Sequence, residues 1–135
     1  MMTDKEARKW LGRARGLEKE IKQNMERRDR EYTRLVSITQ KLTGDIISET
    51  KDPHKYDILV ELNDTITQRC EELRHVQAEV MGKINQIPDR RYREVLSLYY
   101  LDSMSIESAA KAMHYSFQHV KRLRVQAIEE IRKIL

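Results

Sequence analysis

The chain has 135 residues, which is enough for one domain and an extension. Charged residues make up 36% of the sequence and aromatic residues 6%, so the core must be mainly aliphatic. Four glycines and two prolines leave little room for the turns of a β-sheet, which predicts an almost entirely helical chain. The formal net charge of +4 is a mild bias toward anionic partners and could equally be background. The single cysteine, Cys70, excludes an internal disulfide and is expected to pack in the core.

No apolar run approaches the ~18 residues of a membrane span, and the first residues carry no signal-peptide core. We therefore expect a cytoplasmic protein without membrane contact. Taken in chain order, the first expected element is a long helix that begins after Thr3, because Thr3 and Glu6 match a capping box. Gly12 and Gly16 are expected to fray its early turns. Its apolar residues recur every three, four or seven positions: Ala7, Trp10, Ala14, Leu17, Ile21, Met25, Tyr32, Leu35, Ile38, Leu42 and Ile46.

A group of helix-breaking residues follows at 48–53, in which Asp52 suits a helix cap and Pro53 a first helical position. A second apolar series then recurs at nearly the spacing of a coiled-coil seam: Tyr56, Leu59, Leu62, Ile66, Cys70, Leu73, Val76, Val80, Ile84 and Ile87. Two long helices around a short turn predict an antiparallel, coiled-coil-like helical hairpin over residues 1–86.

Several apolar residues lie beside the two seams and would stay in water in a single hairpin: Val36, Ile47, Ile58, Val60 and Met81. We therefore expect the hairpin to serve self-association in a homodimer, or to fold against the C-terminal segment. A solvated hairpin without a partner is the simpler alternative.

Residues 87–135 are predicted to form three helices with a helix-turn-helix arrangement. Pro88 suits the first position of the first helix, which Asp102-Ser103 ends. Ser105 caps a short second helix over 106–112, and residues 113–115 have the length of a helix-turn-helix turn. Ser116 caps the third helix, 116–134. The inward-facing residues of the first and third helices follow the helical period: Tyr92, Val95, Leu96, Tyr99, Val120, Leu123, Ala127 and Ile131.

The third helix has the features of a DNA-reading helix. No acidic residue occurs between Ser108 and Ile128, although four basic residues do: Lys111, Lys121, Arg122 and Arg124. Gln118 and Arg122 are four residues apart and face away from the core, where Arg can pair with guanine and Gln with adenine.

His119, Lys121 and Arg124 are better placed to contact phosphates. Phe117 could contact a thymine methyl group or cover the edge of the core. Ordinary solvated surface charge is the alternative for each basic residue. Arg90, Arg91 and Arg93 could reach the DNA backbone or form internal ion pairs. The candidate DNA-binding residues are therefore Phe117, Gln118, His119, Lys121, Arg122 and Arg124.

The C-terminal segment resembles region four of bacterial sigma factors, the part that reads a promoter element. The resemblance runs through residues of all three helices: Arg93, Glu94, Val95, Leu96, Tyr100, Leu101, Asp102, Ala110, Met113, Ser116, Val120, Arg122, Leu123 and Ala127. The whole chain is similar to small prophage-encoded regulators, including autolysin and late-gene regulators of Gram-positive phages, through residues 52–66 and 113–123. Ser108, Ala109 and His114 depart from the usual region-four pattern.

The resemblance implies a sequence-specific, DNA-binding transcriptional regulator of phage type that binds double-stranded DNA. Two alternatives keep a similar fold: a small DNA-packaging subunit of a terminase, or a module that binds RNA polymerase rather than DNA. The four histidines lack the spacing of metal ligands, and the chain has neither a glycine-rich phosphate loop nor a nucleophile motif. We therefore expect a protein that is not an enzyme and has no cofactor or metal.

Overall fold

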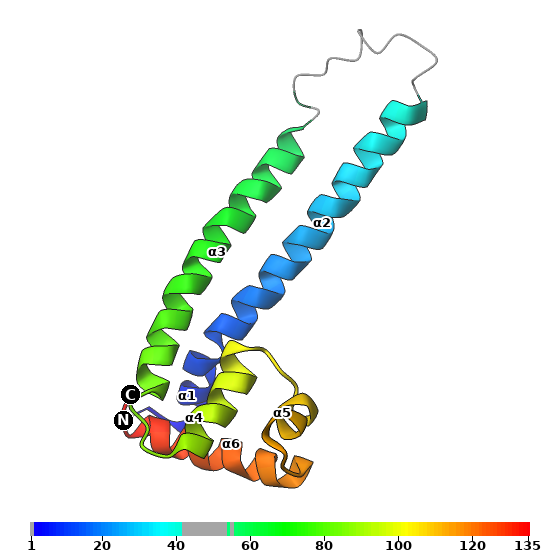
Figure 1. Cartoon of the computed structure of the whole chain (residues 1–135). Helices are drawn as coiled ribbons and strands as arrows, with labels where there is room; N and C mark the ends of the chain where they lie inside the picture. The colour runs from blue at the N-terminus through cyan, green and yellow to red at the C-terminus, as the bar shows by residue number, and fades with distance from the viewer. Residues whose placement is uncertain (1, 42–53, 55) are drawn as a thin grey trace. The chain divides into compact units, whose positions relative to one another are not determined.

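The computed structural model describes residues 2–41, 54 and 56–135 (Figure 1). Within these ranges the chain forms helices and no strand, which confirms the predicted all-α class. The residues gather into two compact units, one made of Met1–Leu17 with Leu73–Leu135 and the other of Glu18–Glu72. The predicted breaker at 48–53, and the apolar residues Leu42, Ile46 and Ile47, lie outside the described residues.

The first helix, α1 (Asp4–Leu11), begins as predicted. The Thr3 side chain accepts a hydrogen bond from the Glu6 backbone N–H, and the Glu6 carboxylate accepts one from the Thr3 backbone N–H. The expectation of one continuous helix is wrong, because Gly12 separates α1 from α2 (Arg13–Lys41). A Cβ atom at Gly12 would come within 3.1 Å of the Arg8 carbonyl oxygen, so the break stands at a position that suits glycine.

The second compact unit contains parts of α2 and of α3 (Asp57–Ile84), which run antiparallel as predicted. Arg69 pairs with Glu20 at 3.0 Å, and Arg28 hydrogen-bonds to Asn63 at 3.5 Å. The residue numbers of the contacting pairs rise along α2 and fall along α3, so the two helices run in opposite directions. The helical hairpin of the predicted fold is therefore confirmed over this unit.

The seam between these helices differs in part from the predicted stripe. Ile21, Leu35 and Ile66 are buried as expected, but Asn24 is buried beside them while its neighbour Met25 is exposed. Other members of the predicted stripes are exposed as well: Tyr32, Ile38 and Tyr56. The apolar period predicted that these exposed residues would be buried. It could not predict the burial of Asn24, because polar side chains are seldom core residues.

The first compact unit has a continuous aliphatic core that α1 shares with the C-terminal helices. Ala7, Leu11 and Ala14 are fully buried in the same cluster as Leu96 and Ile131. The Arg132 Nε donates a hydrogen bond of 3.0 Å to the backbone carbonyl of Met2, at the other end of the chain. This core takes residues from both of the predicted domains, 1–86 and 87–135. The division into these two domains therefore stays a prediction about their separate functions.

The first helix of the C-terminal segment, α4 (Arg90–Leu96), begins two residues later than predicted. Asp89 is its N-cap, and its carboxylate accepts a hydrogen bond of 2.8 Å from the Arg91 backbone N–H. Pro88 therefore precedes the cap and is not the first helical residue. Proline cannot offer a side-chain acceptor, whereas Asp89 satisfies an unpaired N–H group at the helix start.

The helix continues as a π-helix, η2 (Ser97–Leu101), before it ends at Asp102 as predicted. The Asp102 backbone N–H donates to the Ser97 carbonyl at 3.0 Å, a bond that spans five residues. The wider turn buries Tyr100 and leaves Tyr99 partly exposed. The sequence predicted Tyr99 as the inward residue, because an α-helical period was assumed throughout.

The last two helices, α5 (Ile106–Met113) and α6 (Phe117–Arg132), form the predicted helix-turn-helix. Ser105 and Ser116 cap them through side-chain oxygens that accept backbone hydrogen bonds of 3.1 Å. His114 ends α5 at φ 60°, ψ 38°, the left-handed conformation usually taken by glycine. All four predicted core residues of α6 are buried: Val120, Leu123, Ala127 and Ile131. Among the described residues, none of the helices is both long and apolar enough to cross a membrane.

Candidate functional site

The outward face of α6 carries polar and cationic side chains. Gln118, Lys121 and Arg122 are exposed, while Val120 and Leu123 between them are buried. This alternation is what the sequence predicted from the helical period. The face therefore has free hydrogen-bond donors on a helix whose opposite side is fixed in the core.

An aromatic group lies where the turn enters α6. Phe117, the first residue of the helix, is 42% exposed and does not cover the core edge closely. The rings of Tyr115 and His119 lie 4.6 Å apart between centroids and are tilted by 60°. His119 is thereby held half-buried beside the exposed stripe of α6.

Arg124 occupies a different side of α6 from Arg122. Its guanidinium lies 4.5 Å from the centroid of the Tyr99 ring, and the Arg15 guanidinium lies 4.2 Å from the same ring. The Arg124 Nε is buried and has no hydrogen-bond partner in the part of the chain that the structure describes. This arginine makes a cation–π contact inside the unit, so its predicted phosphate contact would require the side chain to leave Tyr99.

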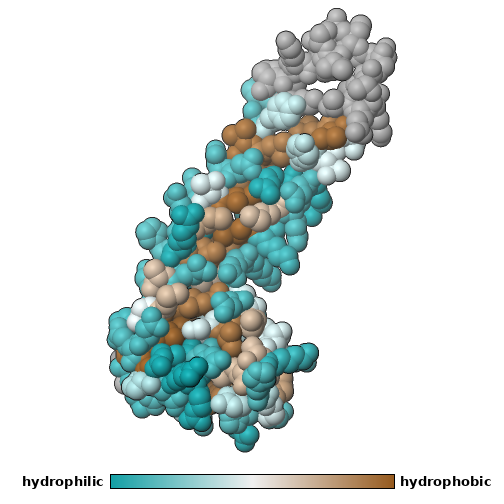
Figure 2. Space-filling model, in the orientation of Figure 1, coloured by the Kyte–Doolittle hydropathy of each residue, from teal (hydrophilic) through white to brown (hydrophobic). Residues whose placement is uncertain are grey.

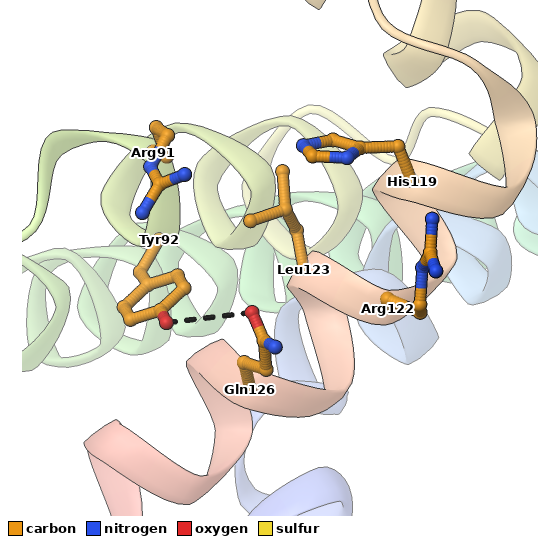
Figure 3. A pocket seen from close by; sticks show the side chains of 6 residues that line it. All are labelled: Arg91, Tyr92, His119, Arg122, Leu123 and Gln126. Atoms are coloured by element: carbon orange, nitrogen blue, oxygen red, sulfur yellow. Dashed lines mark hydrogen bonds between the residues drawn. The ribbon is translucent and has the colours of Figure 1, made fainter.

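A surface hollow of about 420 Å³ lies between α4 and α6 (Figure 3). Figure 3 shows Arg91 and Tyr92 of α4 facing residues of α6, with the Leu123 side chain between Arg91 and His119. The Tyr92 hydroxyl donates a hydrogen bond of 3.4 Å to the Gln126 Oε1. The lining contains two arginines and a histidine and no acidic residue: Arg91, Tyr92, His119, Arg122, Leu123 and Gln126.

The three arginines at the start of α4 have different roles. The Arg91 side chain donates two hydrogen bonds to the Asp89 carboxylate, of 3.1 and 3.4 Å. Hydrogen bonding to Arg91 lowers the pKa of Asp89 and raises that of Arg91, so both stay charged at neutral pH. Arg93 donates to the carbonyl oxygens of Ile87 at 2.6 Å and Pro88 at 2.8 Å, which leaves it occupied within the unit. Arg90 is exposed.

The helix-turn-helix and the helix before it coincide with a known domain family. Residues 86–133 match the family model of sigma-70, region 4. The match covers 48 of the 135 residues, and a search of curated proteins and of solved structures found no match.

The matched segment is called the region-4-like unit below. The match confirms the predicted likeness to sigma region four and supports a DNA-binding, transcription-related role for this segment. The prophage origin of the chain stays a prediction.

Sequence reasoning found most of the exposed face of α6 but missed part of its surroundings. Gln126 follows Arg122 by four residues and could have been added by extending the same stripe. The sequence predicted Tyr92 as a core residue, and it predicted for Arg91 either a contact with the DNA backbone or an internal ion pair. Their position beside His119 depends on the packing of α4 against α6, which no local pattern specifies.

Proposed function

We propose that the protein is a sequence-specific, DNA-binding transcriptional regulator of phage type that reads the major groove with residues 116–134. The observation that carries the proposal is the exposed face of α6 over residues 117–128, which is cationic, carries no acidic residue and is backed by a buried core. A helix with this distribution, placed second in a helix-turn-helix, suits insertion into a groove lined by phosphates. The match to sigma-70, region 4 supports the DNA-binding class. The phage assignment depends on the resemblance of residues 52–66 and 113–123.

Within this proposal, Gln118 and Arg122 contact base edges, and Lys121 and His119 contact phosphates. Phe117 stands exposed at the helix start, where it can meet a thymine methyl group. Regulation by this segment requires no catalytic group, cofactor or metal, and we propose that the protein is not an enzyme.

We also propose that the protein acts as a homodimer through its helical hairpin. The support is a set of apolar side chains on α2 and α3 that a single chain leaves in water: Met25, Tyr32, Val36, Ile58 and Val60. Figure 2 shows apolar residues exposed among polar ones on the long helices. Surfaces of this kind commonly mark a protein interface.

The function is tested by fluorescence anisotropy with labelled duplex DNA at several salt concentrations. Because several phosphates would be neutralised, the logarithm of the affinity should fall linearly with the logarithm of the salt concentration. Selection from a random duplex library should return a preferred site. A protein that fails to bind duplex DNA, or binds it without salt dependence, would overturn the proposal. Capture of RNA polymerase by such a protein would support the polymerase-binding alternative instead.

A further inference from the structure

We infer that the hollow between α4 and α6 binds one backbone phosphate of the DNA that α6 reads, and that Arg91 is its donor from α4. This inference rests on the proposed function and extends the DNA-binding set to a helix outside the helix-turn-helix. In this role, the contact between Arg91 and the phosphate fixes the register of α6 on the duplex.

The first argument is the charge of the hollow. Its lining includes the guanidinium groups of Arg91 and Arg122 and the imidazole of His119, and the Asp89 carboxylate that pairs with Arg91 is not among the lining residues. Cationic groups from two helices that converge on one concave surface attract an oxyanion more strongly than they would singly. Arginine also presents parallel N–H groups that match phosphate oxygens.

The second argument is that Arg91 is already oriented. Asp89 accepts hydrogen bonds from the Nε and Nη2 of Arg91, which restricts the rotation of the side chain. The third nitrogen, Nη1, takes no part in these two bonds and can donate to a ligand in the hollow. A restrained arginine loses less conformational entropy on binding a phosphate than a freely rotating arginine does.

The third argument separates phosphate from base contact. Arg122 belongs both to the outward stripe of α6 and to the hollow, so a ligand in the hollow lies beside the bases that the stripe would read. Arg91 comes from α4, on the opposite side of the hollow from Arg122 in Figure 3. The backbone borders the groove that holds a recognition helix, which makes a phosphate the group within reach of a neighbouring helix.

The test compares Arg91→Gln with Arg90→Gln, since the two substitutions remove equal charge from adjacent residues. Arg90 lines a separate hollow, with Asn85 and Glu94. The N-cap bond to the Arg91 backbone N–H does not depend on its side chain, so both variants should keep the wild-type helicity by circular dichroism.

Affinity for the preferred duplex should fall roughly tenfold in Arg91→Gln and by less than about twofold in Arg90→Gln. The salt slope of Arg91→Gln should become shallower by about one unit. Equal losses in the two variants would overturn the inference and leave the proposed function standing. Absence of DNA binding by the wild-type protein would overturn both.

A second arm identifies the phosphate. Duplexes in which single phosphates are replaced in turn by neutral methylphosphonates should include one position that weakens the wild-type protein but does not weaken Arg91→Gln further. Additive losses at every position would overturn the inference. Inorganic phosphate at matched ionic strength should compete only weakly with the duplex; full displacement would show a site for the free ion rather than for the backbone.

Discussion

At the scale of single residues, the arginines of the region-4-like unit differ in the groups that their side chains contact. Arg93 and Arg124 are occupied within the unit, by backbone carbonyls and by an aromatic ring. Arg122 is exposed on α6, and Arg91 bonds to Asp89 through Nε and Nη2 and not through Nη1. Net charge and residue type do not distinguish the arginines that are occupied within the unit from those that are available to a ligand. The contacts around each guanidinium do.

The clearest test of base reading is a comparison of Arg122→Ala with Lys121→Ala. If Arg122 pairs with a base edge, its loss should cost about 1–3 kcal/mol on the preferred site and relax the preference at one base pair. Lys121→Ala should weaken binding to all sequences about equally. Both residues are exposed, so neither variant should change the unfolding free energy appreciably. Equal loss of specific and random affinity in the two variants would reduce Arg122 to a phosphate contact.

Tyr100 predicts how the stability of the unit depends on alkaline pH. Burial raises the pKa of its hydroxyl, so the folded state favours the neutral form. This contribution is complete below the ordinary tyrosine pKa and is lost as the pH rises through the folded value. Between about pH 8 and pH 11, the urea-unfolding free energy of Tyr100→Phe should therefore decline less than that of the wild type. Exposed Tyr115→Phe is the control and should keep the wild-type decline.

At the scale of elements, capping residues predicted the starts of three helices, two of them in the region-4-like unit. Thr3, Ser105 and Ser116 all cap helices, because a side-chain acceptor followed by an apolar period fixes a helix start locally. The π-helix was missed, because no local sequence signal marks the point where the backbone hydrogen bonds span five residues instead of four. Burial of Asn24 was missed for the same reason: it depends on the register between two helices.

The turn between α5 and α6 carries a measurable strain. His114 adopts a left-handed conformation that disfavours residues with a Cβ atom by about 1–2 kcal/mol. His114→Gly should remove this cost and, after the greater entropy of an unfolded glycine, raise the unfolding free energy by about 0.5–1 kcal/mol. Urea denaturation followed by circular dichroism measures it. His114→Ala keeps the Cβ atom and should not stabilise the unit; stabilisation by both variants would mean that the imidazole, not the backbone, was unfavourable.

At the scale of the whole molecule, the chain joins the region-4-like unit to a hairpin that carries exposed apolar side chains. Met25, Tyr32 and Val36 are 37%, 62% and 36% exposed and recur along one line of α2, at spacings of seven and four residues. A repeated apolar line of this kind is typical of a helix that packs against another helix. Within the described residues, the buried Ile21 and Leu35 lie on the adjoining edge of the same apolar face, so this face of α2 is wider than the hairpin seam.

The last prediction is that this exposed line of α2 holds the proposed homodimer together. Sedimentation equilibrium at tens of micromolar protein should give twice the mass of the chain for the wild type. Tyr32→Lys places a charge on the exposed line and should yield a folded monomer. Ile66→Asp buries an unpaired charge inside the hairpin and should instead unfold the hairpin itself, because such a charge costs several kcal/mol. On DNA, the Tyr32→Lys monomer should keep its affinity for a single half-site and lose the added affinity of two half-sites. A wild-type protein that sediments as a monomer, or a Tyr32→Lys variant that remains dimeric, would show that this line of α2 is not the interface.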